Sequence, residues 1–232
     1  MPHPTQVTMN APVAEEAAPR RLAHEVHRRL EDMIFSGRLR SGEVLTERRL
    51  ADALEVSRTP LRDALLMLEN EGLLKRRGAR YLEVRQMTVP EYMQVLNVRR
   101  LLEPEAARLC IGRIDLRRLA ELRVRLEALI VARSDGTAVG DPEISAAVDT
   151  AMHDDIAAAA GNPIMASMIR DLRRRTRIFD LGRMPDRATA VYREHIDIIV
   201  AIEIGDPHAA SAAMVRHIDN VKASIIRHLS TI

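Results

Sequence analysis

Three times in the second half of this chain, a helix-capping residue stands directly before a proline. The pairs are Asp141-Pro142, Asn162-Pro163 and Asp206-Pro207. A short polar side chain accepts hydrogen bonds from the free amides at a helix start, and proline, which has no N–H, fits the first helical turn. The pairs therefore predict three helix starts, and no alternating strand pattern lies between them.

Other start and stop signals extend this helical pattern over the whole second half. Thr88 and Glu91 have the spacing of a capping box, and further starts lie near Asp115 and Asp186. Together the signals predict six helices, over residues 88–111, 115–133, 142–160, 163–181, 186–204 and 207–230. Pro104 is expected to kink or break the first of them. Residues 88–232 are therefore predicted to form an all-helical antiparallel bundle.

Residues 21–87 show a different pattern. Apolar residues at helical spacing predict a first helix over residues 22–34. Thr46 and Ser57 are predicted to cap a second and a third helix, and Gly72 is predicted to end the third.

Between and after these helices we expect a turn over residues 39–44 and two short strands over residues 73–76 and 81–84. Three helices followed by a hairpin are the order of a winged helix-turn-helix. Residues 1–20 lack periodicity and are predicted to be a disordered tail. The predicted fold class is mainly α, with an N-terminal winged helix-turn-helix followed by the helical bundle.

Composition excludes several classes of protein. The 232 residues include only five aromatic side chains and no tryptophan, which argues against the stacking platforms of single-strand binders. The single cysteine, Cys110, cannot form an internal disulfide, and the first ten residues lack the apolar core of a secretion signal. No apolar run approaches the ~18 residues that a membrane span needs. We expect a soluble cytoplasmic protein without membrane contact.

The positive charge is concentrated in residues 21–87, which contain 14 Lys and Arg against 11 Asp and Glu. Arg58 and Arg62 lie four residues apart on the exposed side of the predicted third helix, whose first turn also contains Ser57 and Thr59. In a helix-turn-helix this helix enters the major groove of DNA, where arginine pairs with guanine or phosphate. An ordinary amphipathic helix with a solvated arginine face is the alternative.

This segment resembles the DNA-binding domain of GntR-type bacterial transcription regulators. The resemblance extends from Leu45-Thr46-Glu47-Arg48-Arg49-Leu50-Ala51 through Val56-Ser57-Arg58-Thr59-Pro60-Leu61-Arg62 to Glu71-Gly72-Leu73. It implies that Arg48, Arg58, Thr59 and Arg62 contact double-stranded operator DNA. It also implies that Arg77 and Gly78, at the tip of the hairpin, reach the minor groove, although the second glycine common in the family is absent.

Four polar residues of the second half are placed for a metal site. Asp149 and His153 are four residues apart, so both lie on one helix face. His195 precedes Gly205 by ten residues and His217 follows Pro207 by ten, which brings both to one level, about 15 Å from the turn. Three imidazoles and a carboxylate can bind Zn²⁺ or another divalent ion. Separate surface or core histidines are the alternative.

The second half resembles the FCD-type effector domain of the FadR subfamily of GntR regulators. The matching residues are Asp149-x-x-x-His153, Gly161-Asn162, Glu194-His195, Met214-x-x-His217 and Arg99-x-x-Leu102-Glu103. The resemblance implies that Asp149, His153, His195 and His217 hold a metal ion, with Zn favoured and Ni or Mn as alternatives. It implies that Arg99 meets the carboxylate of an effector, and six helices indicate the VanR-like subgroup.

The sequence as a whole predicts a homodimeric regulator rather than an enzyme, most simply a repressor, that senses a small organic acid at a metal site. Two alternatives remain open. A metal with an open coordination position could activate water, making the domain a hydrolase tethered to DNA, with Glu194 or Asp155 as the general base. The metal could instead be purely structural, with no effector.

Overall fold

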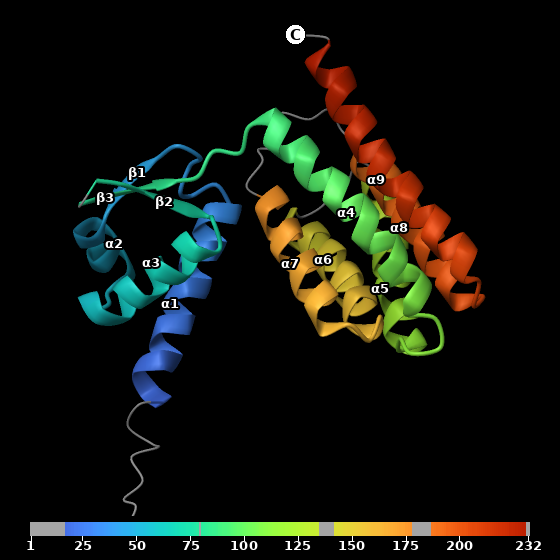
Figure 1. Cartoon of the computed structure of the whole chain (residues 1–232), viewed down its shortest axis with the longest axis horizontal. Coiled ribbons are helices and arrows are strands. Elements are labelled where there is room, and N and C mark those ends of the chain that lie inside the picture. Colours follow the sequence, from blue (N-terminus) through green and yellow to red (C-terminus); the bar gives the residue numbers. More distant parts are fainter. Residues whose placement is uncertain (1–16, 79, 135–141, 178–186, 231–232) are drawn as a thin grey trace, which may run out of the picture. The chain divides into compact units, whose positions relative to one another are not determined.

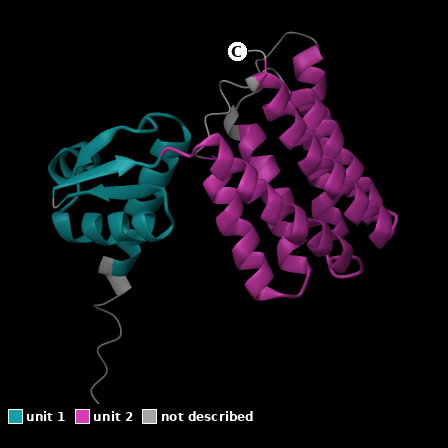
Figure 2. Ribbon diagram, turned by 45° about the horizontal axis from the view of Figure 1, so that its top comes forward, with its two compact units in different colours: residues 1–85 teal, residues 86–232 magenta. Residues whose placement is uncertain are grey.

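The computed structural model covers most of the chain. It describes residues 17–78, 80–134, 142–177 and 187–230. The chain divides into two compact units, residues 1–85 and 86–232 (Figure 2), two residues before the predicted boundary. Of the predicted tail, residues 1–16 lie outside the described ranges. Residues 17–20 belong to the first helix, so the tail prediction is wrong for them.

In its described residues the first unit contains three helices and a three-stranded sheet (Figure 1). Its elements are α1 (Ala17–Phe35), β1 (Val44–Thr46), α2 (Glu47–Leu54), α3 (Arg58–Asn70), β2 (Leu74–Arg77) and β3 (Tyr81–Val84). The strand order is β1-β3-β2, and both pairings are antiparallel. These elements form the winged helix-turn-helix that the sequence predicts.

Strand β1 is the element that the sequence analysis missed, because a turn was expected over residues 39–44. Only three residues long, β1 is too short to show an alternating pattern. It forms because Leu45 pairs with Leu82 of β3 and both side chains are buried. The strand therefore depends on a partner 37 residues away along the chain.

The two predicted caps of the helix-turn-helix differ in structure. Thr46 accepts a hydrogen bond from the Arg49 amide at 3.3 Å and so caps α2 through its side chain. Ser57 precedes α3 in extended conformation, but its hydroxyl makes no capping bond. That exposed hydroxyl at the start of α3 therefore remains available to another partner.

The second unit is a bundle of six helices in its described residues (Figure 1). They are α4 (Val89–Leu109), α5 (Leu116–Ser134), α6 (Pro142–Ala159), α7 (Pro163–Arg177), α8 (Ala188–Glu203) and α9 (Pro207–Leu229). All six predicted helices are present, although residues 178–181, the predicted end of α7, lie outside the described ranges. Helix α4 packs against α6, α7 and α9, while α8 packs against α5 and α9.

Local capping explains why these helices start where they do. Thr88 and Glu91 form the predicted capping box, and Asp206 accepts hydrogen bonds from the amides of residues 208 and 209. Pro104 lies inside α4, which continues to Leu109, so the expected break is absent from this helix. None of the described helices is both long enough and apolar enough to cross a membrane.

Candidate metal centre and DNA-binding surface

Three histidines from three helices meet inside the second unit. His153 comes from α6, His195 from α8 and His217 from α9, and each is at most 4 % exposed. The His195 and His217 ring centroids are 4.6 Å apart, and those of His153 lie 5.3 and 5.6 Å from them. One nitrogen of each ring lies within 4.8 Å of the others. The predicted alignment of His195 with His217 is therefore confirmed, and His153 joins them.

Asp149, the fourth predicted ligand, lies at the edge of this cluster. Its Oδ1 is 3.5 Å from His195 Nε2 and 3.9 Å from His153 Nε2. Its other carboxylate oxygen accepts a hydrogen bond from Arg173 of α7. About a third of the Asp149 side chain is exposed, unlike the buried histidines. The structure thus brings all four predicted ligands together, with the carboxylate on the outer side.

Two glutamates fix the histidine rings from behind. Glu103 Oε2 lies 2.6 Å from His153 Nδ1, and Glu194 Oε2 lies 2.9 Å from His217 Nδ1. The Glu194 carboxylate accepts a hydrogen bond from the N–H at Nδ1 of His217, which leaves Nε2 of that ring for another partner. Neither role was predicted from the sequence, although Glu103 and Glu194 belong to the motifs of the FCD resemblance.

His195 provides the clearest indication of a missing partner. Both of its ring nitrogens are buried and make no hydrogen bond with the described residues. Leaving a buried polar group unsatisfied costs about 1–3 kcal/mol. A divalent ion that prefers nitrogen and oxygen donors would satisfy one of these atoms, and the donor set of three imidazoles and a carboxylate suits it.

Two of the three histidines, His153 and His195, are held in the neutral form that binds metals. Burial, reinforced by the positive charge of Arg173, lowers the pKa of His153 to about 4 despite the adjacent Glu103. Burial and the neighbouring His217 likewise put the pKa of His195 well below its usual range. A proton therefore does not compete with a metal ion for these nitrogens near neutral pH.

The fixed charges around the histidines balance. Arg99 donates to Glu103 one turn further along α4, and Arg173 donates to Asp149. Burial alone would raise the pKa of both carboxyls. The guanidinium groups nevertheless hold the pKa of Glu103, and that of Asp149, below their usual ranges. Two ionised carboxylates thus offset two arginines, and Glu194 is likewise paired with Arg187, so these ion pairs leave no net charge beside the histidines.

Arg99, the predicted effector contact, is engaged within the protein. Its side chain is 8 % exposed and is bound to Glu103, with Thr176 Oγ1 3.4 Å from one terminal nitrogen. That it meets an effector carboxylate stays a prediction. Arg173 was not predicted to belong to the site, because it lies within a run of arginines that offers no distinguishing signal.

Four of the predicted DNA-binding residues lie together on the exposed side of the start of α3. Ser57, Arg58, Thr59 and Arg62 are exposed, opposite the buried Leu61, Leu65 and Leu68. Arg62 donates to Glu47 of α2 at 2.8 Å. Arg48 and Arg58 form no ion pair with any described residue, so both cations are free to meet phosphate or base edges.

At the hairpin tip the two predicted residues are placed differently. Arg77 is exposed and pairs with Glu83 of β3, a buried carboxylate that the sequence did not indicate as a partner. Gly78 is exposed and has φ +67°, a left-handed conformation that favours glycine. The structure therefore shows why glycine stands at this tip, while the contacts of Arg77 and Gly78 with DNA stay predictions.

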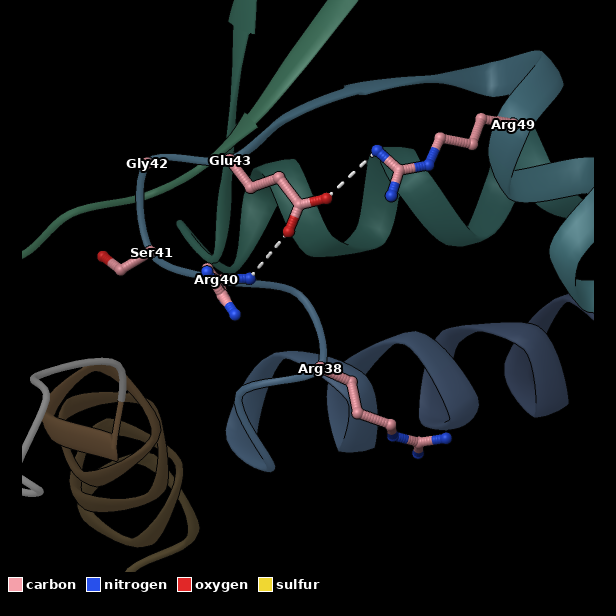
Figure 3. A pocket seen from close by; sticks show the side chains of 6 residues that line it. All are labelled: Arg38, Arg40, Ser41, Gly42, Glu43 and Arg49. Atoms are coloured by element: carbon pink, nitrogen blue, oxygen red, sulfur yellow. Dashed lines mark hydrogen bonds and ion pairs between the residues drawn. The ribbon is translucent and has the colours of Figure 1, made fainter.

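A second basic surface of this unit lies at the connection between α1 and β1. Arg38, Arg40 and Arg49 line a pocket together with Glu43. Figure 3 shows Glu43 between the Arg40 amide, at 3.0 Å, and the Arg49 guanidinium, at 3.1 Å. The Glu43 carboxylate therefore offsets part of the positive charge of this surface.

The comparisons with known proteins match both units. Residues 22–84 match the family model "Bacterial regulatory proteins, gntR family", and residues 94–220, more than half of the chain, match the FCD domain. The chain is 30 % identical over 213 residues to LutR of Bacillus subtilis (strain 168), a transcriptional regulator with a helix-turn-helix. That match covers 82 % of this chain and 94 % of LutR.

A second relative is an Escherichia coli (strain K12) protein named for regulation of an L-lactate dehydrogenase operon. It is 29 % identical over 230 residues, and the match covers 90 % of this chain and 88 % of the relative. Among solved structures, E. coli McbR/YncC has the same fold, with a TM-score of 0.74 at 24 % identity over 89 % of this chain and 98 % of its own. The chain belongs to the gntR family of bacterial transcription regulators, and its second unit is an FCD domain.

Proposed function

We propose that this regulator is a homodimeric repressor whose FCD domain binds a divalent metal ion together with a small organic acid, and that the acid changes affinity for operator DNA. The observation that carries the proposal is the cluster of His153, His195 and His217 beside Asp149, buried in an environment of balanced charge. DNA binding follows from the family; the ligand and the direction of regulation are proposed.

On the DNA side, we assign base and phosphate contacts to the exposed residues at the start of α3 and on α2, and minor-groove contacts to the hairpin tip. The proposed residues are Arg48, Ser57, Arg58, Thr59, Arg62, Arg77 and Gly78. The free guanidinium groups of Arg48 and Arg58 support this assignment. A symmetric dimer then requires two half-sites related by a dyad.

Asp149, His153, His195 and His217 would hold the metal ion. When bound, the ion supplies a concentrated positive charge to which a carboxylate can coordinate. Three imidazole ligands favour zinc, with nickel and manganese as alternatives. The unpartnered nitrogens of His195 support the presence of an ion at this place.

Charge balance supports an acid rather than a neutral effector. The pairs Arg99–Glu103 and Arg173–Asp149 already cancel, so a divalent ion brings two uncompensated positive charges into a buried site. An isolated buried charge is costly, and an anionic ligand offsets it. The name of the E. coli relative points to the same class, because lactate is a small carboxylate. Arg99 stays the proposed second contact of the effector.

The hydrolase alternative receives no support from the two carboxylates considered as general base. Glu194 is bonded to His217, Arg187 and Asn220, and Asp155 is paired with Arg118. A base must be free to take a proton from water. Turnover by the metal-loaded protein on ester and amide substrates would favour the hydrolase over the regulator.

A thermal-shift experiment tests the metal and acid together. The full-length protein, stripped of metal or loaded with Zn²⁺, is heated with a panel of small carboxylic acids that includes L-lactate. A ligand at 100 times its dissociation constant stabilises the folded state by about 2.7 kcal/mol. We expect an acid to raise Tm in the loaded protein only, while the uncharged L-lactamide has no effect. Equal shifts without metal, or with the amide, would refute the proposed site.

A further inference from the structure

We infer that Glu194 is a positioning residue of the FCD domain. It holds the His217 ring so that Nδ1 carries the proton and the lone pair of Nε2 is presented to the metal ion. The inference rests on the proposed metal binding, but it concerns a residue outside the ligand set. The juxtaposition that carries it is the 2.9 Å contact between Glu194 Oε2 and His217 Nδ1.

Glu194 is itself held in one orientation. Its Oε1 accepts hydrogen bonds from Arg187 and, at 2.8 Å, from Asn220 Nδ2, so Oε2 is directed at His217. Arg187 lies at the start of α8, and Asn220 lies one turn beyond His217 on α9. The carboxylate is therefore fixed from both helices that carry the His195 and His217 rings.

The chemistry of the pair determines the tautomer. An ionised carboxylate only accepts hydrogen bonds, so the imidazole must donate from Nδ1. A neutral imidazole has one proton, and Nε2 is then a lone-pair donor. Carboxylates behind metal-bound histidines orient the ring and raise its basicity, and their loss lowers metal affinity about 10- to 100-fold.

The other two histidines show why Glu194 is the informative residue. Glu103 lies 2.6 Å from His153 Nδ1 but is also the buried partner of Arg99, so replacing it leaves an unpaired charge in the core. Neither ring nitrogen of His195 makes a hydrogen bond with a described residue. Glu194 is 16 % exposed in its side chain, and its removal is better tolerated by the fold.

Two variants and a matched control test the role by metal affinity. Full-length wild type, Glu194→Ala, Glu194→Gln and Glu203→Ala are stripped of metal and titrated with Zn²⁺ against a chromophoric chelator. Glu203 is the control because it lies on the same helix, is paired with Arg123, and is similarly buried. We expect Glu194→Ala to bind zinc 10- to 100-fold more weakly. Glu194→Gln, which keeps a neutral acceptor, should lose less, and the control should match wild type.

Nitrogen NMR of the metal-free protein supplies a second readout, and its wild-type result tests the inference whether or not a variant folds. With ¹⁵N-labelled histidine, the His217 signal is expected in the Nδ1–H form, and in Glu194→Ala it should become a mixture of tautomers. An Nε2–H form in wild type, or zinc affinity of Glu194→Ala within threefold of wild type, would overturn the inference alone. A wild-type protein that binds no zinc would overturn the proposed metal site and the inference with it.

Discussion

Replacing His195 by leucine should stabilise the metal-free protein while abolishing its response to metal. Both ring nitrogens of His195 are buried without a hydrogen-bond partner among the described residues, and the side chain is 1 % exposed. An unsatisfied buried polar group costs about 1–3 kcal/mol, and leucine has a similar volume without polar atoms. We therefore expect His195→Leu to raise the stability of the metal-free protein by about 1–3 kcal/mol.

For a chain of this size, each kcal/mol corresponds to roughly 2–4 °C in Tm. Wild type, His195→Leu and the control His208→Leu are compared by scanning calorimetry in excess chelator and in excess Zn²⁺. His208 is exposed on α9, so its variant should stay within about 0.5 kcal/mol of wild type. In zinc, wild type should gain stability and His195→Leu should not. A lower Tm of His195→Leu in chelator would show that its nitrogens are satisfied without metal and would refute the reasoning.

Further predictions concern DNA, the ligands and the cysteine. Arg58→Ala should cost about 1–3 kcal/mol of operator binding in fluorescence anisotropy, and an equal loss on random DNA would show that Arg58 contacts phosphate only. The double variant His153→Ala, His217→Ala should lose bound metal in elemental analysis; full retention would place the metal elsewhere. Burial raises the pKa of Cys110 to about 11, so at pH 8 the thiol stays protonated. Mass spectrometry should therefore find it alkylated by iodoacetamide in urea but not in the native protein, and rapid native labelling would contradict its burial.

Local signals account for the elements that the sequence analysis placed correctly. The capping box of Thr88 and Glu91 and the cap at Asp206 act within three residues, so the helices they start can be identified without knowing the fold. Strand β1 was missed because its three residues depend on pairing with Leu82. Ser57 was placed correctly as a cap, but its side chain makes no capping bond.

The candidate site was predictable where spacing along a helix was sufficient. His195 and His217 are equally far from the turn between α8 and α9, which predicted that they meet, and the four-residue spacing placed Asp149 beside His153. The ion pair that neutralises Asp149 could not be predicted from spacing along a helix, because its partner Arg173 comes from a different helix. Glu103 follows Arg99 by four residues, the spacing of an ion pair on one helix, so this pair could have been predicted from the sequence.

Operator affinity in four conditions tests the central claim most directly. An operator fragment selected in vitro is titrated with full-length protein by fluorescence anisotropy, with the protein either stripped or loaded with Zn²⁺, and with or without the acid that stabilises the loaded form. For a repressor released by its ligand, we predict that the acid weakens binding at least tenfold, a coupling of about 1.4 kcal/mol, in the loaded protein only. The same dissociation constant in all four conditions would contradict a metal-dependent acid sensor.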